Sequence, residues 1–198
     1  MKIVLNDGQL EQFEVYKDEL VKWSKVHNLT TLRTDDDILN LHFLDSLAYL
    51  YAIPADASRI ADIGSGAGFP GLPLAIAQPE HDFVLYERSV KKMAFLKHIV
   101  RLLNLTRVQV RKGDEKIVHT PEGCFQCVVS RALWRPSQLY NHVKNILCMD
   151  GVIVVSEGPS YKSFLNDLPS SVDSRIVPIK MPHNVDRWLI VLISGRIR

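Results

Sequence analysis

A glycine-rich segment, Asp62 to Gly71, follows a short apolar run that ends at Ile63, and it limits the possible folds more than any other feature of the chain. Gly64, Gly66 and Gly68 can adopt the positive φ angles that a tight loop needs, and they have no Cβ to hold a ligand away from the backbone. An apolar helix is predicted directly after the segment. The pattern therefore predicts a nucleotide-cofactor loop between a strand and a helix.

The residues around this loop predict a regular alternation of strands and helices. Strands are expected at 59–63, 83–86, 108–110, 125–130, 152–156, 175–179 and 188–193, and helices at 72–77, 90–103 and 137–147. Such alternation is typical of a parallel sheet in an α/β fold. The last two strands read as an antiparallel closing pair, which is common at the edge of such sheets. We expect a seven-stranded, mostly parallel, doubly wound sheet.

The first 57 residues have a different pattern. Apolar positions recur with a helical period over residues 9 to 26, and Thr34 is placed to cap a second helix over residues 38 to 50. Pro54 then marks a hinge. We predict a helical extension at residues 1–57 and a main domain at 58–198, together one compact unit of a size that supports a single full core.

Charge is divided unevenly along the chain. Residues 1–58 contain 5 Lys or Arg and 10 Asp or Glu, a net charge of −5, whereas residues 59–198 contain 19 and 12, a net charge of +7. Nine basic side chains fall within residues 88–116. A polyanionic partner and an ordinary solvated helix face both explain this cluster. No targeting segment and no membrane-spanning stretch is evident, so we expect a cytoplasmic protein.

The three cysteines predict neither a metal site nor a redox role. Cys124 and Cys127 form an isolated CxxC with no second pair and no histidines at zinc spacing. Cysteine usually behaves as a small buried apolar residue. Cys127 is expected to point into the sheet.

Two glycine frames compete for the identity of the cofactor. Gly66 to Gly71 matches the dinucleotide pattern GxGxxG, which is a weak signal alone. The strand ends at Ile63, however, so the tight turn begins at Gly64, and in that frame the third fingerprint position is Phe69 instead of Gly or Ala. The placement of the strand therefore argues against a dinucleotide.

Two acidic residues favour S-adenosylmethionine. Asp62, at the strand end, is an acceptor suited to a cationic ammonium group. Glu87 ends the second strand, where a carboxylate can accept hydrogen bonds from both hydroxyls of a ribose. The alternative is a purely structural turn in which Asp62 caps the following helix.

Four motifs occur in an order and spacing that resemble one family: Asn28-Leu-Thr30, His42-Phe-Leu-Asp-Ser46, Asp62 to Pro73, and Ser130-Arg-Ala132. Over about residues 10 to 195 the chain resembles the RsmG (glucose-inhibited division protein B) methyltransferases. The resemblance implies a class I, Rossmann-like, S-adenosylmethionine-dependent methyltransferase. It also implies methylation of N7 of a guanine in bacterial 16S ribosomal RNA, with that RNA or the 30S subunit or its precursor as partner. We expect a monomer and no metal.

The resemblance also implies roles for individual residues. The implied cofactor site consists of Asp62, Gly64, Ser65, Gly66, Gly68, Phe69, Glu87, Asp114, Glu115, Lys116 and Arg131. Arg131, Asn28 and Arg187 are the implied catalytic residues, and His42 and Asp45 match positions that look functional in the family. Structural roles are the alternatives: Asn28 as a turn, His42 and Asp45 as ties between helix and sheet, and Arg187 as a surface ion pair.

The chain departs from the family at three basic positions. Leu41 replaces a usual arginine, a basic residue is missing or displaced in 111–115, and Glu157-Gly158 stands where Lys-Gly is usual. These losses leave two other hypotheses open. One is a divergent relative that methylates another RNA or a small molecule, and the other is a cofactor-binding RNA module without turnover.

The implied chemistry needs no general base, because guanine N7 has a lone pair and no proton, so positioning is sufficient. Positive charge moves onto the base during transfer, which favours an apolar site with acceptors nearby. Trp134 is a candidate platform for stacking the guanine. Its alternative role is a hydrophobic lid over the helix that follows.

Overall fold

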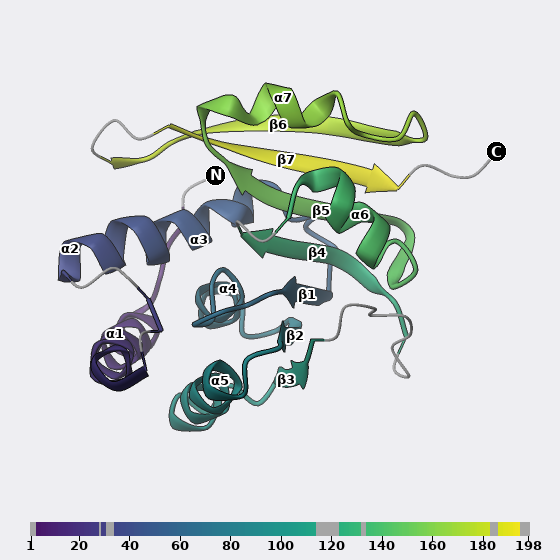
Figure 1. Cartoon of the computed structure of the whole chain (residues 1–198). Helices are drawn as coiled ribbons and strands as arrows, with labels where there is room; N and C mark the ends of the chain where they lie inside the picture. The colour runs from purple at the N-terminus through teal and green to yellow at the C-terminus, as the bar shows by residue number, and fades with distance from the viewer. Residues whose placement is uncertain are drawn as a thin grey trace.

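The computed structural model describes residues 3–27, 29–30, 34–113, 123–131, 134–182 and 186–194. Seven strands form one sheet with helices on both of its faces (Figure 1). The strands are β1 (Arg59–Ile63), β2 (Asp82–Glu87), β3 (Val108–Lys112), β4 (Phe125–Arg131), β5 (Leu147–Glu157), β6 (Val172–Lys180) and β7 (Asp186–Ser194).

The sheet has the order β3-β2-β1-β4-β5-β7-β6. Its first five strands are parallel, and β7 runs antiparallel to both β5 and β6. The chain leaves β1 toward β2 on one side, while β4 lies on the other side. The strand order therefore reverses between β1 and β4, and ligands of open α/β sheets bind at such a point, outside the carboxyl ends of the strands.

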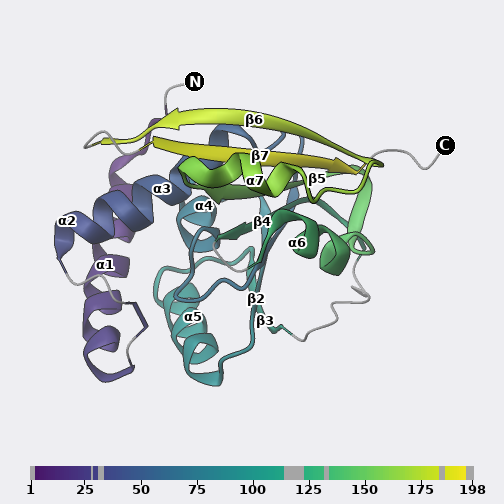
Figure 2. The same ribbon diagram turned by 45° about the horizontal axis from the view of Figure 1, so that its top comes forward.

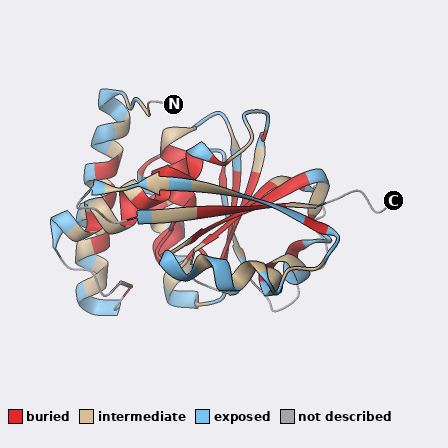
Figure 3. Cartoon of the chain, turned by 90° about the horizontal axis from the view of Figure 1, so that it is seen from above, coloured by how far each residue is buried: buried red, intermediate tan, exposed pale blue. Residues whose placement is uncertain are grey.

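Each face of the sheet is covered by its own set of helices (Figure 2). The helices after β1 and β2, α4 (Gly71–Ala77) and α5 (Val90–Leu102), pack on one face, and α6 (Pro136–Val143) packs on the other. The short helices η3 (Pro159–Tyr161) and α7 (Lys162–Leu165) follow β5 on the α6 side. This two-sided cover makes the central strands the most buried part of the molecule (Figure 3).

Alternation along each strand builds the two core layers. In β4, Cys127 and Val129 join the layer shared with α4 and α5, whereas Val128 joins the layer shared with α6. All three are fully buried. A strand buried on both faces reads as a continuous apolar run, as parallel strands with two-sided cover do.

The N-terminal segment packs against the first face of the sheet. It consists of α1 (Asp7–His27) and a continuous helical stretch made of α2 (Asp35–Ile38), the π-helical turn η1 (Leu39–Leu44), α3 (Asp45–Leu47) and the 3₁₀ turn η2 (Ala48–Tyr51). Thr34 caps α2 as predicted, accepting a hydrogen bond from Asp37 N at 3.1 Å. Tyr16 and Leu20 of α1 are fully buried in the same core layer as α4 and α5.

The predicted α/β class, the seven strands and the antiparallel closing pair are confirmed. The helix expected at 137–147 is wrong at its end, because α6 stops at Val143 and Leu147 already belongs to β5. On α5, Phe95, Leu96 and Ile99 are the buried positions, because α1 covers the side of this helix that carries Phe95, through Tyr16 and Trp23.

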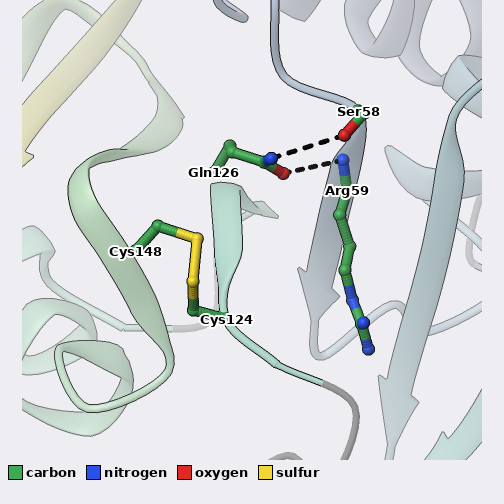
Figure 4. Close-up of a disulfide and its surroundings, with 5 residues drawn as sticks. All are labelled: Ser58, Arg59, Cys124, Gln126 and Cys148. Carbon is green, nitrogen blue, oxygen red and sulfur yellow. Dashed lines mark hydrogen bonds between the residues drawn. A yellow bond between two sulfur atoms is a disulfide. The ribbon is translucent and has the colours of Figure 1, made fainter.

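The cysteines divide into two kinds. Cys127 is free and fully buried in the sheet, as expected. Cys124 and Cys148 form a disulfide that joins the residue before β4 to the start of β5 (Figure 4), a pairing that was not predicted from the sequence. Beside it, Gln126 Oε1 accepts a hydrogen bond from Arg59 N at 2.9 Å and thereby links β4 to β1.

Within the described residues, no helix is both long enough and apolar enough to cross a membrane.

Candidate functional site

The loop after β1 folds around the carboxyl end of β2. Gly64 N and Ser65 N both donate to Tyr86 O, at 2.9 and 3.0 Å. Gly68 N and Phe69 N donate to Ser65 O, at 2.7 and 2.8 Å, which closes the turn before α4. These contacts place the predicted cofactor loop at the point where the strand order reverses.

The three loop glycines adopt positive φ angles, of 74° at Gly64, 60° at Gly66 and 107° at Gly68. A Cβ on Gly66 would meet no atom closer than 3.9 Å, so this glycine faces open space. A Cβ on Gly68 would come within 2.4 Å of Leu72 Cδ1 and 2.6 Å of the Tyr16 hydroxyl. The expectation that all three glycines make room for a ligand is therefore wrong at Gly68, whose small size serves protein packing.

Asp62 is fully buried at the end of β1. Its Oδ2 accepts a hydrogen bond from Gly71 N at 2.9 Å, which is the helix-capping role considered above. Its Oδ1 has no hydrogen-bond partner among the described residues. Burial raises the pKa of this carboxyl to about 7, although the Gly71 hydrogen bond, the nearby Ser65 hydroxyl and the charge of Arg131 oppose the shift.

Glu87 connects the loop to the end of β2. Its Oε2 accepts from Gly66 N at 2.8 Å and its Oε1 from Ser89 N at 2.7 Å. The side chain is buried, with 6% exposed. Each carboxylate oxygen has further lone pairs. The two hydrogen bonds therefore orient Glu87 and still leave it able to accept hydrogen bonds from hydroxyl groups.

Phe69 lies at the centre of an aromatic and cationic stack. Its ring is 4.3 Å from that of His42 and 5.5 Å from that of Tyr16, in both cases nearly parallel. The Arg131 guanidinium carbon lies 5.0 Å from the ring centre. The stack joins the glycine loop to the N-terminal helices on one side and to the end of β4 on the other.

Arg131 ends β4 and reaches the N-terminal helices through three hydrogen bonds. Its Nη1 donates to Leu41 O at 3.0 Å and to Asp45 Oδ2 at 3.4 Å, and its Nη2 donates to His42 Nδ1 at 2.9 Å. An arginine is always a donor, so Nδ1 of His42 must be the acceptor and its Nε2 carries the hydrogen toward Thr30 Oγ1, 2.8 Å away. Burial and the nearby Arg131 charge lower the pKa of His42 to about 4.

Asp45 holds two arginines with one buried carboxylate. Its Oδ1 accepts from Arg187 Nε at 2.9 Å, and its Oδ2 contacts Arg131. The Asp45 side chain is 6% exposed, whereas those of Arg131 and Arg187 are 19% and 27% exposed. The two guanidinium groups are therefore fixed at their inner ends and reach solvent at the outer surface.

A cavity of about 310 Å³ opens beside this ion pair, between the α2–η1 stretch and the end of the β6–β7 hairpin. The two elements lie together at one end of the molecule in Figure 1. Leu41 and Asp45 of the helical stretch line the cavity, together with Met181, Pro182 and Arg187 of the hairpin. The cavity therefore borders the residues that anchor Arg131.

The structure brings most of the predicted residues to one edge of the sheet. The loop residues, Glu87 and Arg131 meet at the carboxyl ends of β1, β2 and β4, and Arg187 joins them through Asp45. Asn28, Asp114, Glu115 and Lys116 lie outside the described residues. Ser65 is buried, and its hydroxyl donates to Asp62 O at 3.1 Å.

Tertiary structure adds residues that the sequence reasoning missed. The Tyr16 hydroxyl donates a hydrogen bond to Ala67 O at 2.6 Å and thereby links α1 to the glycine loop. The Tyr49 hydroxyl donates to Ser130 O at 2.8 Å and accepts from Ser156 N at 3.0 Å, which ties the ends of β4 and β5 together. In the sequence, both tyrosines look like ordinary buried positions of a helix. No local signal therefore predicts that their hydroxyl groups support the loop and the strand ends.

Trp134 packs against α6, as the lid alternative predicts. Its ring lies 4.4 Å from that of His142 on α6, nearly parallel to it. It also packs against the core layer on that face. One face of the indole is therefore covered by the protein itself.

A family model and individual relatives of known name both point to the same family. Residues 9–186 match the GidB family, described as rRNA small subunit methyltransferase G. Proteins named ribosomal RNA small subunit methyltransferase G include one from Desulfitobacterium hafniense, 37% identical over 80% of this chain and 66% of that protein. Another, from Halorhodospira halophila, is 34% identical over 99% of this chain and 92% of that protein.

Solved structures of methyltransferases share the fold. The O-methyltransferase TomG from Streptomyces achromogenes, in complex with SAM, has a TM-score of 0.63 and 15% identity over 98% of this chain and 93% of that chain. A methyltransferase from Pyrococcus furiosus has a TM-score of 0.64 and 12% identity over 96% of this chain and all of that chain.

Among the described residues, no group of three or more His, Cys, Asp or Glu could hold a metal ion.

Proposed function

Because this chain belongs to the rRNA small subunit methyltransferase G family, we propose that it transfers a methyl group from S-adenosylmethionine to N7 of a guanine in 16S ribosomal RNA. The observation that carries the proposal is the meeting of Asp62, the open Gly66 and Arg131 at the point where the strand order reverses. Ligand sites of open α/β sheets occur at this place.

The residues present fit S-adenosylmethionine. Asp62 Oδ1 is a buried acceptor without a described partner, and it suits the ammonium group of the cofactor. Gly66 leaves space for close approach to the backbone. Glu87 is fixed beside Gly66, where it would accept the ribose hydroxyls. Asp114 and Glu115, outside the described residues, would meet the adenine, as the family resemblance implies.

When bound, S-adenosylmethionine supplies an activated methyl group on a sulfonium sulfur. Methylation forms a bond from guanine N7 to the methyl carbon and breaks the bond from that carbon to sulfur, so the positive charge passes to the base and no proton moves. The protein then has to position two reactants in line, and positioning alone lowers a barrier substantially. This requirement agrees with a site that contains no activated nucleophile among its described residues.

Arg131 is the residue best placed to position the RNA. Asp45, Leu41 O and His42 fix its inner face, and its remaining N–H groups are available for a phosphate or for the guanine edge. The low pKa of His42 keeps that ring neutral, so His42 adds no positive charge beside the developing cation. Arg187 is held by the same carboxylate and would contact the RNA at the rim of the cavity.

Labelling of small subunits tests the proposal directly. Purified protein, tritiated S-adenosylmethionine and 30S subunits that lack the modification should yield one labelled guanine, identified as N7-methylguanine by digestion and chromatography. Fully modified subunits are the control and should accept no label.

Two observations motivate parallel arms of this experiment. Leu41 and Glu157 replace basic residues that are usual in the family, and burial raises the pKa of Glu157. The same reaction should therefore be run with total RNA and with a metabolite extract. Label in either of these, with none in 16S RNA, would indicate a divergent substrate. Binding to 30S subunits without label in any arm would indicate an RNA module without turnover.

A further inference from the structure

Most of the basic cluster found in the sequence lies on α5 and β3. Residues 88–112, which include both elements, contain eight Lys or Arg and no Asp or Glu. The neighbouring helix α1 differs, because it contains five Asp or Glu and three Lys, and its Lys17 and Lys22 pair with Glu14 and Glu19. An ordinary solvated surface mixes the two signs as α1 does. The charge of α5 therefore needs another explanation.

The cations of α5 also occupy positions that an isolated helix disfavours. Lys91 and Lys92 lie in the first turn, at the positive end of the helix dipole, and that turn holds no acidic residue. Lys97 and Arg101 are four residues apart, so their like charges repel each other on one side of the helix. Departures from local rules of this kind are typical of functional surfaces.

Five exposed cations of this region have no ion pair within the described part of the chain: Arg88, Lys91, Lys97, Arg101 and Lys112. Lys112 belongs to the side of β3 that faces α5, because Val108 and Val110 on the same side join the core layer of that helix. Arg107, at the opposite end of β3, is instead held by Asp82 at 3.0 Å. We call the five unpaired cations the α5 basic face.

The α5 basic face begins beside the cofactor loop. Arg88 directly follows Glu87, which accepts a hydrogen bond from Gly66 N, and Lys112 is the partner of Glu87 in the β2–β3 ladder. From this end α5 runs away from the loop, and residues 91–101 span about 15 Å along its axis. The face lies at the end of the sheet remote from β6 (Figure 1). A strand of nucleic acid on this face would therefore reach the edge of the cofactor site.

The chemistry of this face suits phosphates better than a protein surface. Lysine is depleted at protein interfaces, whose binding energy comes mainly from aromatic residues and arginine in well-packed pockets. Lys and Arg are the side chains that neutralise the phosphates of nucleic acids. The adjacent α1 and the first turn of α2 have an excess of acidic residues, which repel the same phosphates. The charges therefore direct a polyanion to α5 and away from α1.

We propose that the α5 basic face binds phosphates of the ribosomal RNA and orients this substrate beside the cofactor site. The inference rests on the proposed function and adds the surface that holds the RNA outside the site. The face touches no reacting atom, so it contributes equally to binding of the substrate and of the transition state. Loss of such uniform binding raises KM and leaves kcat unchanged.

The salt dependence of RNA binding tests this surface. Each neutralised phosphate adds about 0.7 to 0.9 to the slope of log Kd against log salt concentration. The α5 triple variant, Lys91→Gln/Lys97→Gln/Arg101→Gln, should therefore lower the slope for 16S RNA by about 2 to 3, and weaken Kd at least about tenfold at about 0.1 M salt. Its Kd for S-adenosylhomocysteine should stay within about twofold of wild type, and in 30S methylation its KM should rise with kcat unchanged.

A control triple variant removes the same charge from another part of the surface. Lys144, Lys162 and Arg175 are exposed and lie at the end of α6, in α7 and in β6. Lys144→Gln/Lys162→Gln/Arg175→Gln should keep the slope within about 0.5 of wild type. Equal slopes in the two triple variants would overturn the proposal.

A charge-conserving variant separates lost charge from a weakened helix. Lys91→Arg/Lys97→Arg/Arg101→Lys changes the same three positions and keeps their charges, so its salt slope should equal that of wild type. A slope as low as that of the α5 triple variant would show that the effect comes from the helix and not from its charge, and would also overturn the proposal.

The possible failures remain distinguishable, because binding is measured without a methyl donor. If wild-type protein methylates 16S RNA but the α5 triple variant keeps the wild-type slope, the surface is wrong and the proposed reaction stands. If the slope falls as expected while wild-type protein methylates no guanine in 16S RNA, the surface stands and the reaction is wrong. If the variant weakens binding to 30S subunits but not to protein-free 16S RNA, the face contacts a ribosomal protein and the proposal is wrong.

Discussion

Arg131 Nη2 donates a hydrogen bond to His42 Nδ1 over 2.9 Å, and this contact joins the carboxyl end of β4 to the N-terminal helices. Asp45, three residues after His42, accepts a hydrogen bond from the same guanidinium. The N-terminal segment is therefore part of the site. Its helices position the arginine that we expect to meet the RNA.

Arg131→Lys should separate positioning from charge. Lysine keeps the positive charge but cannot reach Leu41 O, Asp45 and His42 together, because it lacks the planar fork of N–H groups. We expect a loss of about 10- to 100-fold in kcat/KM for 30S methylation, which corresponds to about 1.4 to 3 kcal/mol. Arg107→Lys changes an exposed ion pair with Asp82 and should leave kcat/KM within about twofold of wild type. Equal activity of the two variants would exclude the positioning role.

Asp45→Asn should weaken both the fold and the site. The substitution leaves Arg131 and Arg187 without their shared carboxylate. Removing one partner of a fully buried pair costs about 3 to 5 kcal/mol, and the partial exposure of both arginines reduces our expectation to about 2 kcal/mol. Urea unfolding measures the free energy of unfolding. Asp82→Asn, which removes an exposed pair with Arg107, should cost less than about 1 kcal/mol, and a similar cost in both variants would contradict the prediction.

Two glycine variants should affect different properties, ligand binding for Gly66→Ala and stability for Gly68→Ala. Gly66→Ala places a methyl group in open space, so the free energy of unfolding should fall by only about 1 to 2 kcal/mol while S-adenosylhomocysteine binding is lost in calorimetry. Gly68→Ala drives a Cβ against Leu72 and the Tyr16 hydroxyl, so we expect it to cost more than about 3 kcal/mol of stability. If Gly66→Ala binds the ligand normally, Gly66 does not face the cofactor.

Asp62 should make cofactor affinity depend on pH. Its folded pKa of about 7 means that the carboxylate that would accept the ammonium group forms only as the pH rises through neutrality. We expect the Kd of S-adenosylhomocysteine to fall about tenfold from pH 6 to pH 8, following the ionised fraction. Asp62→Asn should bind weakly and without this trend. A pH profile shared by wild type and variant would rule out Asp62 as its source.

The same group should affect stability with a defined sign. Because the pKa of Asp62 is raised on folding, the native state retains its proton between about pH 4 and pH 7 while the unfolded chain does not, so stability falls as the pH rises through that window. The difference is on the order of 4 kcal/mol for a shift of about three pKa units. Urea unfolding of wild type and Asp62→Asn across this range measures it as the change in their difference.

His42 should remain neutral far below the usual range for histidine. Burial and the charge of Arg131 lower its pKa to about 4, so its contribution to stability is present above about pH 6.5 and is lost as the pH falls toward 4. Nitrogen-15 NMR should show an unprotonated Nδ1 and a protonated Nε2 down to about pH 5. Arg131→Gln should raise this pKa in part, since burial, the larger cause, remains. Titration of wild-type His42 near 6.5 would contradict both the burial of the ring and its contact with Arg131.

The elements that could be predicted are those with a strong local signal. The run from Arg59 to Ile63, the glycines after it and the acidic end of β2 mark the loop without any knowledge of the rest of the chain. The end of α6 and the start of β5 were missed because apolar residues such as Leu147 fit a buried helix and a buried strand equally well.

The sequence by itself determined the α/β class, the strand count and the position of the glycine loop, because periodicity and glycine spacing are local properties of the chain. Only the tertiary structure decided that Gly68 serves packing, that Asp45 joins Arg131 to Arg187, and that Asp37 and Met181 border one cavity. These relationships connect residues up to 144 positions apart. Contact at that separation is set by how helices and strands pack, and that depends on the free energy of the whole core and not on any local sequence pattern.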